Sequence, residues 1–230
     1  MDYQGEKTGV LAATEAELEP LLACLENVST KKHAMLTVYE GSLDAKIVVA
    51  VSCGVCKVNA AVAAQVLIDL FGVTRVAMIG AAGRLDARLK IGDVVVSDTL
   101  AYHDIKGLSL NDYHPYFTEP DFKVDSRLLE RAKAVASDLA QTVYFGRIVT
   151  GEAFVVDEGR QEIIDLFNPL CVDMESTAAA HVCYLNGIPF IAIRAVSDTE
   201  DESGIGAFED NLKLSADNAF AVLRALLRRL

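Results

Sequence analysis

The sequence is short of positive charge. Its 230 residues include 21 lysines and arginines against 33 aspartates and glutamates, which gives a formal net charge of −12. Proteins that neutralise nucleic-acid phosphates draw their affinity from clustered Lys and Arg, so this composition argues against a nucleic-acid-binding surface. An acidic balance of this size is typical of soluble cytoplasmic proteins.

Long apolar runs are missing as well. The longest apolar stretch, around residues 60–71, is interrupted by Gln65 and Asp69, so it is not expected to span a bilayer. The first seven residues are polar and acidic, without the basic segment and apolar core of a secretory signal. We therefore expect a cytoplasmic protein that has no membrane partner.

Cysteine is scarce and lacks a framework spacing. The five cysteines are an odd number, which favours reduced thiols in the cytoplasm. Cys53 and Cys56 form a CxxC pair, but no second pair or suitably placed histidine completes a zinc site. A redox or metal role is the less favoured interpretation. The favoured one is a turn at Gly54 that joins a strand to a helix.

The sequence does contain the alternation typical of an α/β protein. Apolar residues make up 52% and charged residues 23%, which is a globular composition. No linker, repeat or low-complexity segment interrupts the pattern, so we expect one domain over residues 1–230. The expected strands are 9–13, 36–40, 46–52, 75–80, 93–97, 143–150 and 188–196, and the expected helices are 15–26, 57–71, 126–139 and 208–230. Turns are expected at 41–42 and 81–83, and a long irregular loop at 104–121.

Two acidic motifs after expected strands have plain structural interpretations. Thr14 and Glu17 have the spacing of a capping box, which is common where helices begin. Glu175, beside Asp173, opens a helix of small apolar residues, where the helix dipole favours a carboxylate. Ligands of open α/β sheets bind beyond the carboxyl ends of the strands, so both acids are also candidates for a functional role.

A third motif ends the expected strand 188–196. Arg194 lies inside this apolar run, and a buried guanidinium is costly unless it is paired. Asp198 follows at the strand end, where Ser197 and Glu200 also have capping-box spacing. The buried arginine favours a functional role over a purely structural one.

Together with other stretches, these motifs resemble the methylthioadenosine/S-adenosylhomocysteine nucleosidases, within the purine nucleoside phosphorylase superfamily. The resemblance follows the family's order and covers nearly the whole chain. It implies a three-layer α/β sandwich with a central mixed, twisted sheet flanked by helices, and a homodimer for which the helix 57–71 is a candidate surface. The matching stretches are 9–17 (GVLAATEAE), 53–61 (CGVCKVNAA), 79–83 (IGAAG), 91–97 (IGDVVVS), 102–104 (YHD), 150–154 (TGEAF), 172–175 (VDME) and 194–198 (RAVSD).

The resemblance also implies a hydrolysis that releases adenine from a 5′-modified nucleoside, with water as co-substrate and without a metal or organic cofactor. In that reaction Glu17 activates the water, which Arg194 helps to hold, and Asp198 protonates N7 of the departing adenine. Glu175 binds the ribose hydroxyls. The remaining implied contacts are Met174 at the ribose, Phe154 and Val155 at the base, Val55 and Phe208 at the 5′ substituent, and Ala81, Gly83 and Ser197 elsewhere in the pocket.

This assignment fits the chemistry of glycosidic bonds. An acid on one side of the sugar and an ionised carboxylate on the other also carry out inverting glycoside hydrolysis. Asp198 must then hold a proton at neutral pH, which requires burial or a hydrogen bond to its neutral form. Glu17 must stay ionised, which a nearby Arg194 favours.

Other functions stay open. A phosphorylase of this fold would need cationic and hydroxyl groups for phosphate. Met78 and Ala81 stand where hexameric phosphorylases place an arginine and a serine, and Arg84 is the remaining candidate cation. A non-catalytic nucleoside-binding protein would not need both an acid and a base. A nucleosidase for another purine nucleoside, such as an aminodeoxyfutalosine, is also compatible.

Some positions depart from the family. Ala81 replaces a Ser or Thr whose hydroxyl helps to place the water, a loss of about 0.5–1.5 kcal/mol. Thr14 replaces a frequent methionine, and residues 106–120, which in the family reach the neighbouring subunit's pocket, do not match well. The 5′ substituent of the substrate is therefore left open. His103 and His181 are expected to have structural roles.

Overall fold

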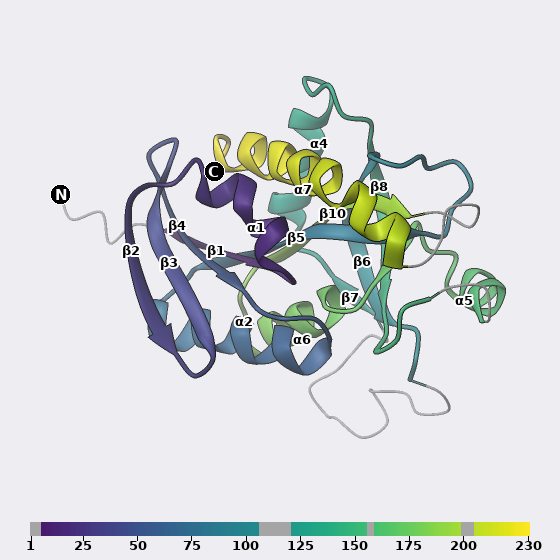
Figure 1. Cartoon of the computed structure of the whole chain (residues 1–230), viewed down its shortest axis with the longest axis horizontal. Helices are drawn as coiled ribbons and strands as arrows, with labels where there is room; N and C mark the ends of the chain where they lie inside the picture. The colour runs from purple at the N-terminus through teal and green to yellow at the C-terminus, as the bar shows by residue number, and fades with distance from the viewer. Residues whose placement is uncertain (1–5, 106–120, 156–158, 199–204) are drawn as a thin grey trace.

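The computed structural model describes residues 6–105, 121–155, 159–198 and 205–230. Within these ranges one mixed sheet of ten strands has helices on both of its faces (Figure 1). The strands are β1 (Lys7–Ala12), β2 (Glu26–His33), β3 (Leu36–Leu43), β4 (Lys46–Ser52), β5 (Arg75–Arg84), β6 (Val94–Tyr102), β7 (Phe122–Lys123), β8 (Val143–Thr150), β9 (Cys171–Asp173) and β10 (Phe190–Asp198). The helices are α1 (Glu15–Leu22), α2 (Lys57–Phe71), α4 (Ser126–Ala136), α5 (Arg160–Phe167), α6 (Ser176–Asn186) and α7 (Ile205–Leu227).

The strands at the centre of the sheet are parallel, and one end of the sheet closes on itself. β1 pairs in parallel with β4 and β5, and β5 pairs in parallel with β10. At one edge β4, β3 and β2 form an antiparallel meander. At the other end the strands follow the order β10-β6-β8-β9-β5, and β10 also pairs with β5, so these five strands close into a ring. Because β1, β4, β5 and β10 are parallel, their carboxyl ends meet at the same edge.

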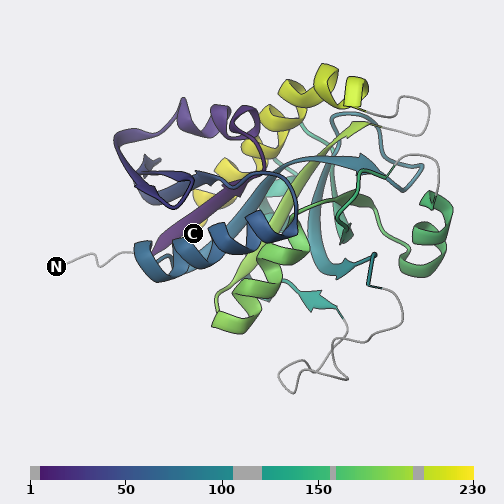
Figure 2. The ribbon, with the colours of Figure 1, turned by 60° about the horizontal axis from the view of Figure 1, so that its bottom comes forward.

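The two larger hydrophobic clusters lie on opposite faces of the sheet. α2 and α6 pack side by side over one face (Figures 1 and 2), and α1, α4 and α7 cover the other. Leu11 of β1 points into the core beneath α2 and α6, whereas Val10 and Ala12 point into the opposite core. Successive side chains of a strand alternate between its faces, so a strand buried on both sides is apolar throughout. No helix in the described ranges has both the length and the apolar character needed to cross a membrane.

Several elements match the prediction from sequence, and others do not. α2 and β8 begin and end at the predicted residues. The turn predicted at residues 81–83 is wrong, because β5 continues to Arg84. In this stretch Ala81 pairs with Ala195, and Ala82 with Val196. Pairing with β10 supplies the hydrogen bonds that keep these small residues extended, and this partner is distant in the sequence.

The helix predicted at residues 15–26 is confirmed over Glu15–Leu22, but its predicted end is wrong, and so is the turn predicted at Gly41-Ser42. The helix α1 ends at Leu22, and the exposed strand β2 starts at Glu26. All eight residues of β2 are exposed, so the strand has no apolar alternation that could have revealed it. Gly41 and Ser42 lie within β3. The chain reverses at Asp44 and Ala45, whose φ values of 48° and 64° suit a tight hairpin turn.

Candidate active site

A cavity of about 310 Å³ lies at the carboxyl ends of β1, β4, β5 and β10, and the residues after β8 and β9 complete its wall. The acidic motifs were predicted at this same edge of the sheet. Arg194 is not among the lining residues, and the side chain of Phe208, in α7, lies outside the described residues. The predicted site residues that line the cavity are Glu17, Val55, Ala81, Gly83, Phe154, Val155, Met174, Glu175, Ser197 and Asp198.

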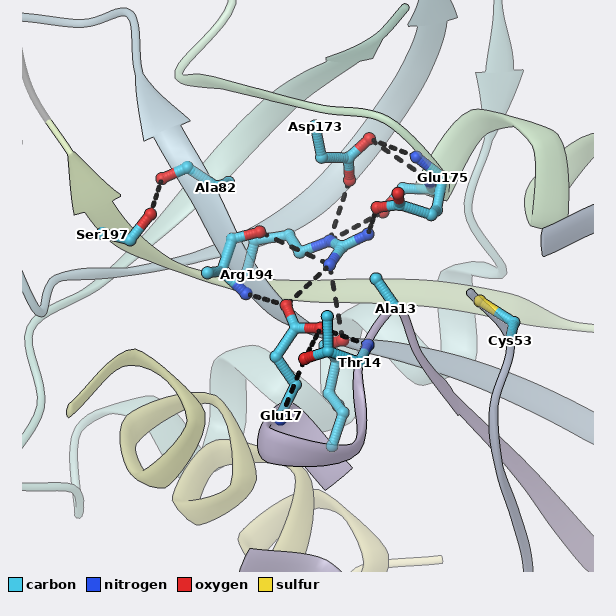
Figure 3. Close-up of polar contacts among 12 residues, drawn as sticks. Ala13, Thr14, Glu17, Cys53, Ala82, Asp173, Glu175, Arg194 and Ser197 are labelled. Carbon is cyan, nitrogen blue, oxygen red and sulfur yellow. Dashed lines mark hydrogen bonds and ion pairs between the residues drawn. The ribbon is translucent and has the colours of Figure 1, made fainter. Parts of the chain in front are cut away.

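Glu17 is at once part of a helix cap and part of the cavity wall (Figure 3). Its Oε2 accepts hydrogen bonds from the backbone N–H of Thr14 at 2.8 Å and from the Thr14 hydroxyl at 2.9 Å. The Glu17 N–H donates in turn to Thr14 Oγ1 at 3.3 Å, which completes the predicted capping box. Glu17 Oε1 accepts the N–H of Ala81 at 2.8 Å. The cap therefore aims the carboxylate at the end of β5.

Arg194 is fully buried beneath the cavity and is surrounded by carboxylates (Figure 3). Its Nε donates to Oδ2 of Asp173 at 2.8 Å, and its Nη2 donates to Oε2 of Glu175 at 3.1 Å. Nη1 lies 3.8 Å from Oε1 of Glu17. A buried guanidinium is tolerated when ion pairs and hydrogen bonds compensate for the lost water, as they do in this network.

Gly80 makes this close approach of charges to the backbone possible. Its φ of 142° is a conformation that side chains rarely adopt. A Cβ at this position would overlap the carboxylate of Glu17 and would lie 2.7 Å from Nη1 of Arg194. Gly80 lies within a stretch that resembles the family, but it was not among the predicted site residues.

Asp173 is a second residue of the site that was not among the predicted site residues. Its Oδ1 accepts hydrogen bonds from the Thr150 hydroxyl at 2.6 Å and from the N–H groups of Glu175 and Ser176 at 3.2 and 3.1 Å. Asp173 therefore satisfies backbone N–H groups at the start of α6, where the N-cap residue Glu175 makes no capping bond with its own side chain. The other oxygen of Asp173 binds Arg194, so the same carboxylate also fixes the guanidinium. The sequence feature that could have identified Asp173 is an acidic residue at the end of a strand, two residues before Glu175.

Glu175 links two helices and the buried arginine. Its Oε1 accepts the backbone N–H of Cys56 at 2.9 Å, at the start of α2. Burial raises the pKa of Glu175 to about 7, although the charge of Arg194 acts in the opposite direction. The carboxyl group therefore exchanges its proton near neutral pH and lies on the cavity wall.

Asp198 has a different environment on the same cavity wall. The residue is 1% exposed, and its Oδ1 accepts the Ser197 hydroxyl at 2.8 Å. Its Oδ2 is buried and has no hydrogen-bond partner among the described residues. Burial raises the pKa of Asp198, and the bond from Ser197 opposes this only in part. The group is therefore arranged to retain a proton and to offer it to a ligand.

The CxxC pair shows no sign of activated thiols. Both cysteines are free, and burial raises the pKa of Cys53 to about 12 and raises that of Cys56 as well. Reactive thiols have a lowered pKa, so the geometry favours the predicted turn over a redox role. Gly54 and Cys56 have φ values of 87° and 85°, as the reversal before α2 requires. The described ranges contain no cluster of three His, Cys, Asp or Glu residues suited to a metal ion.

The remaining candidates lie away from the reacting groups. Arg84 Nη1 donates to the carbonyl oxygen of Leu89 at 3.3 Å, and the described cavity lining contains neither Lys nor Arg. His181 Nδ1 lies 3.2 Å from the hydroxyl of Tyr102. The loop 106–120 and the predicted cap partner Glu200 lie outside the described residues.

Comparison with known proteins places this geometry in a family. The sequence profile of the phosphorylase superfamily matches residues 7–228. The 5′-methylthioadenosine/S-adenosylhomocysteine nucleosidase of Halalkalibacterium halodurans is 32% identical over 232 residues, which cover 97% of this chain and 99% of that protein.

Solved structures give the same result. The nucleosidase of this name from Neisseria meningitidis, in complex with methylthio-immucillin-A, superposes with a TM-score of 0.91 at 34% identity and covers 98% of this chain and 100% of its own. The futalosine hydrolase of Helicobacter pylori has a TM-score of 0.90 at 27% identity, with 100% of both chains covered. The chain therefore belongs to the 5′-methylthioadenosine/S-adenosylhomocysteine nucleosidase family of the phosphorylase superfamily.

Proposed function

We propose that this protein hydrolyses the N-glycosidic bond of a 5′-modified adenine nucleoside, methylthioadenosine or S-adenosylhomocysteine, and releases adenine. The observation that carries the proposal is the contrast between two buried carboxyl groups on the wall of one cavity. Asp198 has a raised pKa and an unpartnered oxygen within the described chain, which suits a proton donor. Glu17 lies 3.8 Å from Arg194 and accepts three hydrogen bonds that fix the direction of its oxygens, which suits a general base.

The reaction follows from these environments. Asp198 transfers its proton to N7 of adenine, so the base departs neutral when the bond to C1′ breaks. Glu175 holds the ribose hydroxyls while the sugar acquires oxocarbenium character. Glu17 accepts a proton from the water whose oxygen bonds to C1′. Loss of a proton from Glu17 and uptake of one by Asp198 restore the resting state.

Arg194 acts through the carboxylates in this proposal. Its guanidinium is buried behind the wall, and its donors bind Asp173, Glu175 and main-chain oxygens. The arginine therefore orients Glu175 through a hydrogen bond and lies 3.8 Å from the carboxylate of Glu17. We assign it a positioning role, which refines the expectation that it holds the water.

Water is favoured over phosphate as the nucleophile. A phosphate dianion needs cationic groups and charge-assisted hydrogen bonds. No Lys or Arg lines the described cavity, and Arg84 binds the carbonyl oxygen of Leu89. The backbone N–H of Ala81 is bonded to Glu17, so it is not free for a phosphate oxygen.

The substrate preference concerns the group on C5′. Thr14 lines the cavity, and its hydroxyl is engaged by Glu17, as a donor to the carboxylate and as an acceptor of the N–H. An apolar methylthio substituent suits such a wall. The similarity to a futalosine hydrolase keeps an aminodeoxyfutalosine as the alternative substrate.

The decisive experiment is incubation with methylthioadenosine, S-adenosylhomocysteine and aminodeoxyfutalosine, each with and without phosphate, followed by analysis of the sugar product. We expect adenine and free 5-methylthioribose from methylthioadenosine without phosphate. A sugar 1-phosphate that forms only with phosphate would make the protein a phosphorylase. Binding without adenine release would make it a nucleoside-binding protein.

We also propose that the protein works as a cytoplasmic homodimer. Apolar side chains are exposed on the outer sides of the adjacent helices α2 and α6, including Val58 (71%), Val62 (48%), Leu70 (55%) and Leu185 (54%). Exposed apolar side chains on two adjacent helices are typical of a protein–protein interface. The free cysteines are consistent with a reducing compartment.

A further inference from the structure

A group of charged residues lies at the rim of the cavity, outside the carboxylate network. Nζ of Lys57, in the first turn of α2, is 2.7 Å from Oδ2 of Asp104 and 3.6 Å from Oε2 of Glu152. The same oxygen of Asp104 accepts the backbone N–H of Glu152 at 2.9 Å. These contacts, which we call the rim tether, join the start of α2, the residues after β6 and the residues after β8.

The tether holds the segment that forms one wall of the cavity. Ala153, Phe154 and Val155 line the cavity, but their backbone belongs to no helix or strand. Phe154 is 38% exposed, so packing restrains it weakly. The bond from Glu152 to Asp104 is charge-assisted, which makes it stronger than a bond between neutral groups. The position of this wall therefore depends on the tether.

His103 and Tyr102 pack against the rim tether and restrict the movement of its residues further. A Cβ on Gly151 would overlap the ring of His103, so the wall segment begins in close contact with the residue before Asp104. On the other side, Nζ of Lys57 lies 5.4 Å from the centre of the Tyr102 ring, a favourable place for a cation. The ammonium group is thus held between an aromatic face and two carboxylates.

The tether also connects the two halves of the nucleoside site. The N–H of Cys56 donates to Glu175, and the N–H of the next residue, Lys57, lies 3.4 Å from Oε2 of Glu152. The start of α2 therefore contacts both the carboxylate proposed for the ribose and the segment proposed for the base. A displacement at one contact changes the distance between the two subsites.

We infer that Asp104 and Lys57 are positioning residues that hold the 152–155 wall in place and thereby set the affinity for the adenine base. This inference rests on the proposed function, because it assigns the wall to the base of the nucleoside. The acid, the base and the ribose carboxylate are not part of the tether. Loss of the tether should therefore weaken binding and leave the bond-breaking step nearly unchanged.

Kinetics of four variants test the inference. In Asp104→Ala we expect KM for the nucleoside and Kd for adenine, from calorimetry, to rise about tenfold, with kcat within about twofold, as the loss of one charge-assisted hydrogen bond predicts. Asp104→Asn should recover part of the affinity, because its amide oxygen can still accept the Glu152 N–H. Lys57→Met should resemble Asp104→Asn. Lys213→Met, which removes an exposed ion pair with Asp217, is the matched control and should bind like wild type.

Hydrogen exchange supplies a readout that does not depend on catalysis. Asp104→Ala should speed amide exchange in peptides that cover 151–155 and leave β10 unchanged. Variants with wild-type KM, Kd and exchange would overturn the inference, as would a loss of kcat at constant KM, which would place the effect of the tether in the bond-breaking step. Failure of the proposed function is seen separately in the wild-type protein, which would then release no adenine. In that case the exchange data still decide whether Asp104 fixes the wall.

Discussion

Two carboxyl groups of the cavity, Asp198 and Glu175, have raised pKa values for the same reason but with different partners. Burial dominates in both cases. Glu175 has Arg194 at 3.1 Å, which favours its ionised form, whereas Asp198 has a hydroxyl at 2.8 Å and an oxygen without a partner among the described residues. The two acids of this cavity therefore have different roles because their surroundings differ.

Asp198→Asn tests this separation. The amide keeps the shape of the side chain but cannot donate a carboxyl proton, so kcat should fall about 10²–10⁴-fold while analogue binding is retained. Because the pKa of Asp198 is raised, the wild-type rate should decline as pH rises through that pKa and the proton is lost. The measurement is a pH profile of kcat for both proteins. Asp138→Asn, at an exposed aspartate that also follows a serine, is the control, and equal rates for Asp198→Asn and wild type would exclude Asp198 as the acid.

Residues of the site differ in how far they can be predicted from sequence. Glu17 can be found because it lies in the first helical turn after a strand, and Asp198 because it ends a strand. Arg194 can be found because a charge inside an apolar run needs a partner. Gly80 and Asp173 were missed, since their roles depend on Glu17 and Arg194, which are distant in the sequence. A local motif cannot show which buried charges meet.

At the scale of elements, α1 shows how a helix cap can serve a reaction. Thr14 caps the helix, and its hydroxyl and N–H both bind the Glu17 carboxylate. The cap interpretation and the catalytic interpretation of residues 14–17 are therefore compatible. The rigid start of α1 fixes the carboxylate opposite the end of β5, where Ala81 donates its N–H.

Thr14→Ala should therefore lower both stability and activity. Loss of the cap costs about 1 kcal/mol of unfolding free energy, and the freed Glu17 should lower kcat about tenfold or more. Thr14→Ser should restore both. Asp125→Ala is the matched control, because Asp125 caps α4 through the N–H groups of Arg127 and Leu128, away from the cavity. The measurements are urea unfolding and kcat of the three variants. If Thr14→Ala loses stability but not rate, Thr14 serves only as a helix cap and does not position Glu17 for the reaction.

The bounds of α2 could be predicted because its buried residues recur at helical spacing, from Ala60 to Phe71. The bounds of β8 were also predicted, although its burial shows no alternation. β2 was missed since its exposed residues carry no pattern, and β5 was cut short because Ala81 to Gly83 gain their extended form from pairing with β10 and β9. The ring that closes the sheet is likewise a consequence of pairing between distant strands.

At the scale of the whole molecule, the buried carboxyl of Glu175 should make stability depend on pH. Its folded-state pKa of about 7 lies above the ordinary value of 4.5, so the folded protein binds a proton that the unfolded chain releases. The resulting stabilisation is complete below pH 4.5 and is lost as pH rises through 7, by at most about 3 kcal/mol. Glu175→Gln lacks this titration. Raising the pH from 5 to 8 should therefore lower the unfolding free energy of the wild type relative to that of the variant. Unfolding free energies from urea titration at both pH values measure this, and a constant difference would contradict the raised pKa.

The apolar surface of α2 and α6 sets the last prediction. A stable dimer buries roughly 1,600 Å² in total, and charges at the centre of such an interface are unfavourable. Val58 and Val62 lie one turn apart on α2 and are 71% and 48% exposed, so a Val58→Asp/Val62→Asp variant should sediment as a monomer where wild type sediments as a dimer. Leu166→Asp, at an equally exposed position (68%) on α5, should leave the dimer intact and so controls for added charge. Identical sedimentation of the α2 variant and wild type would move the interface elsewhere, because two aspartates one turn apart cannot be accommodated in a packed apolar contact.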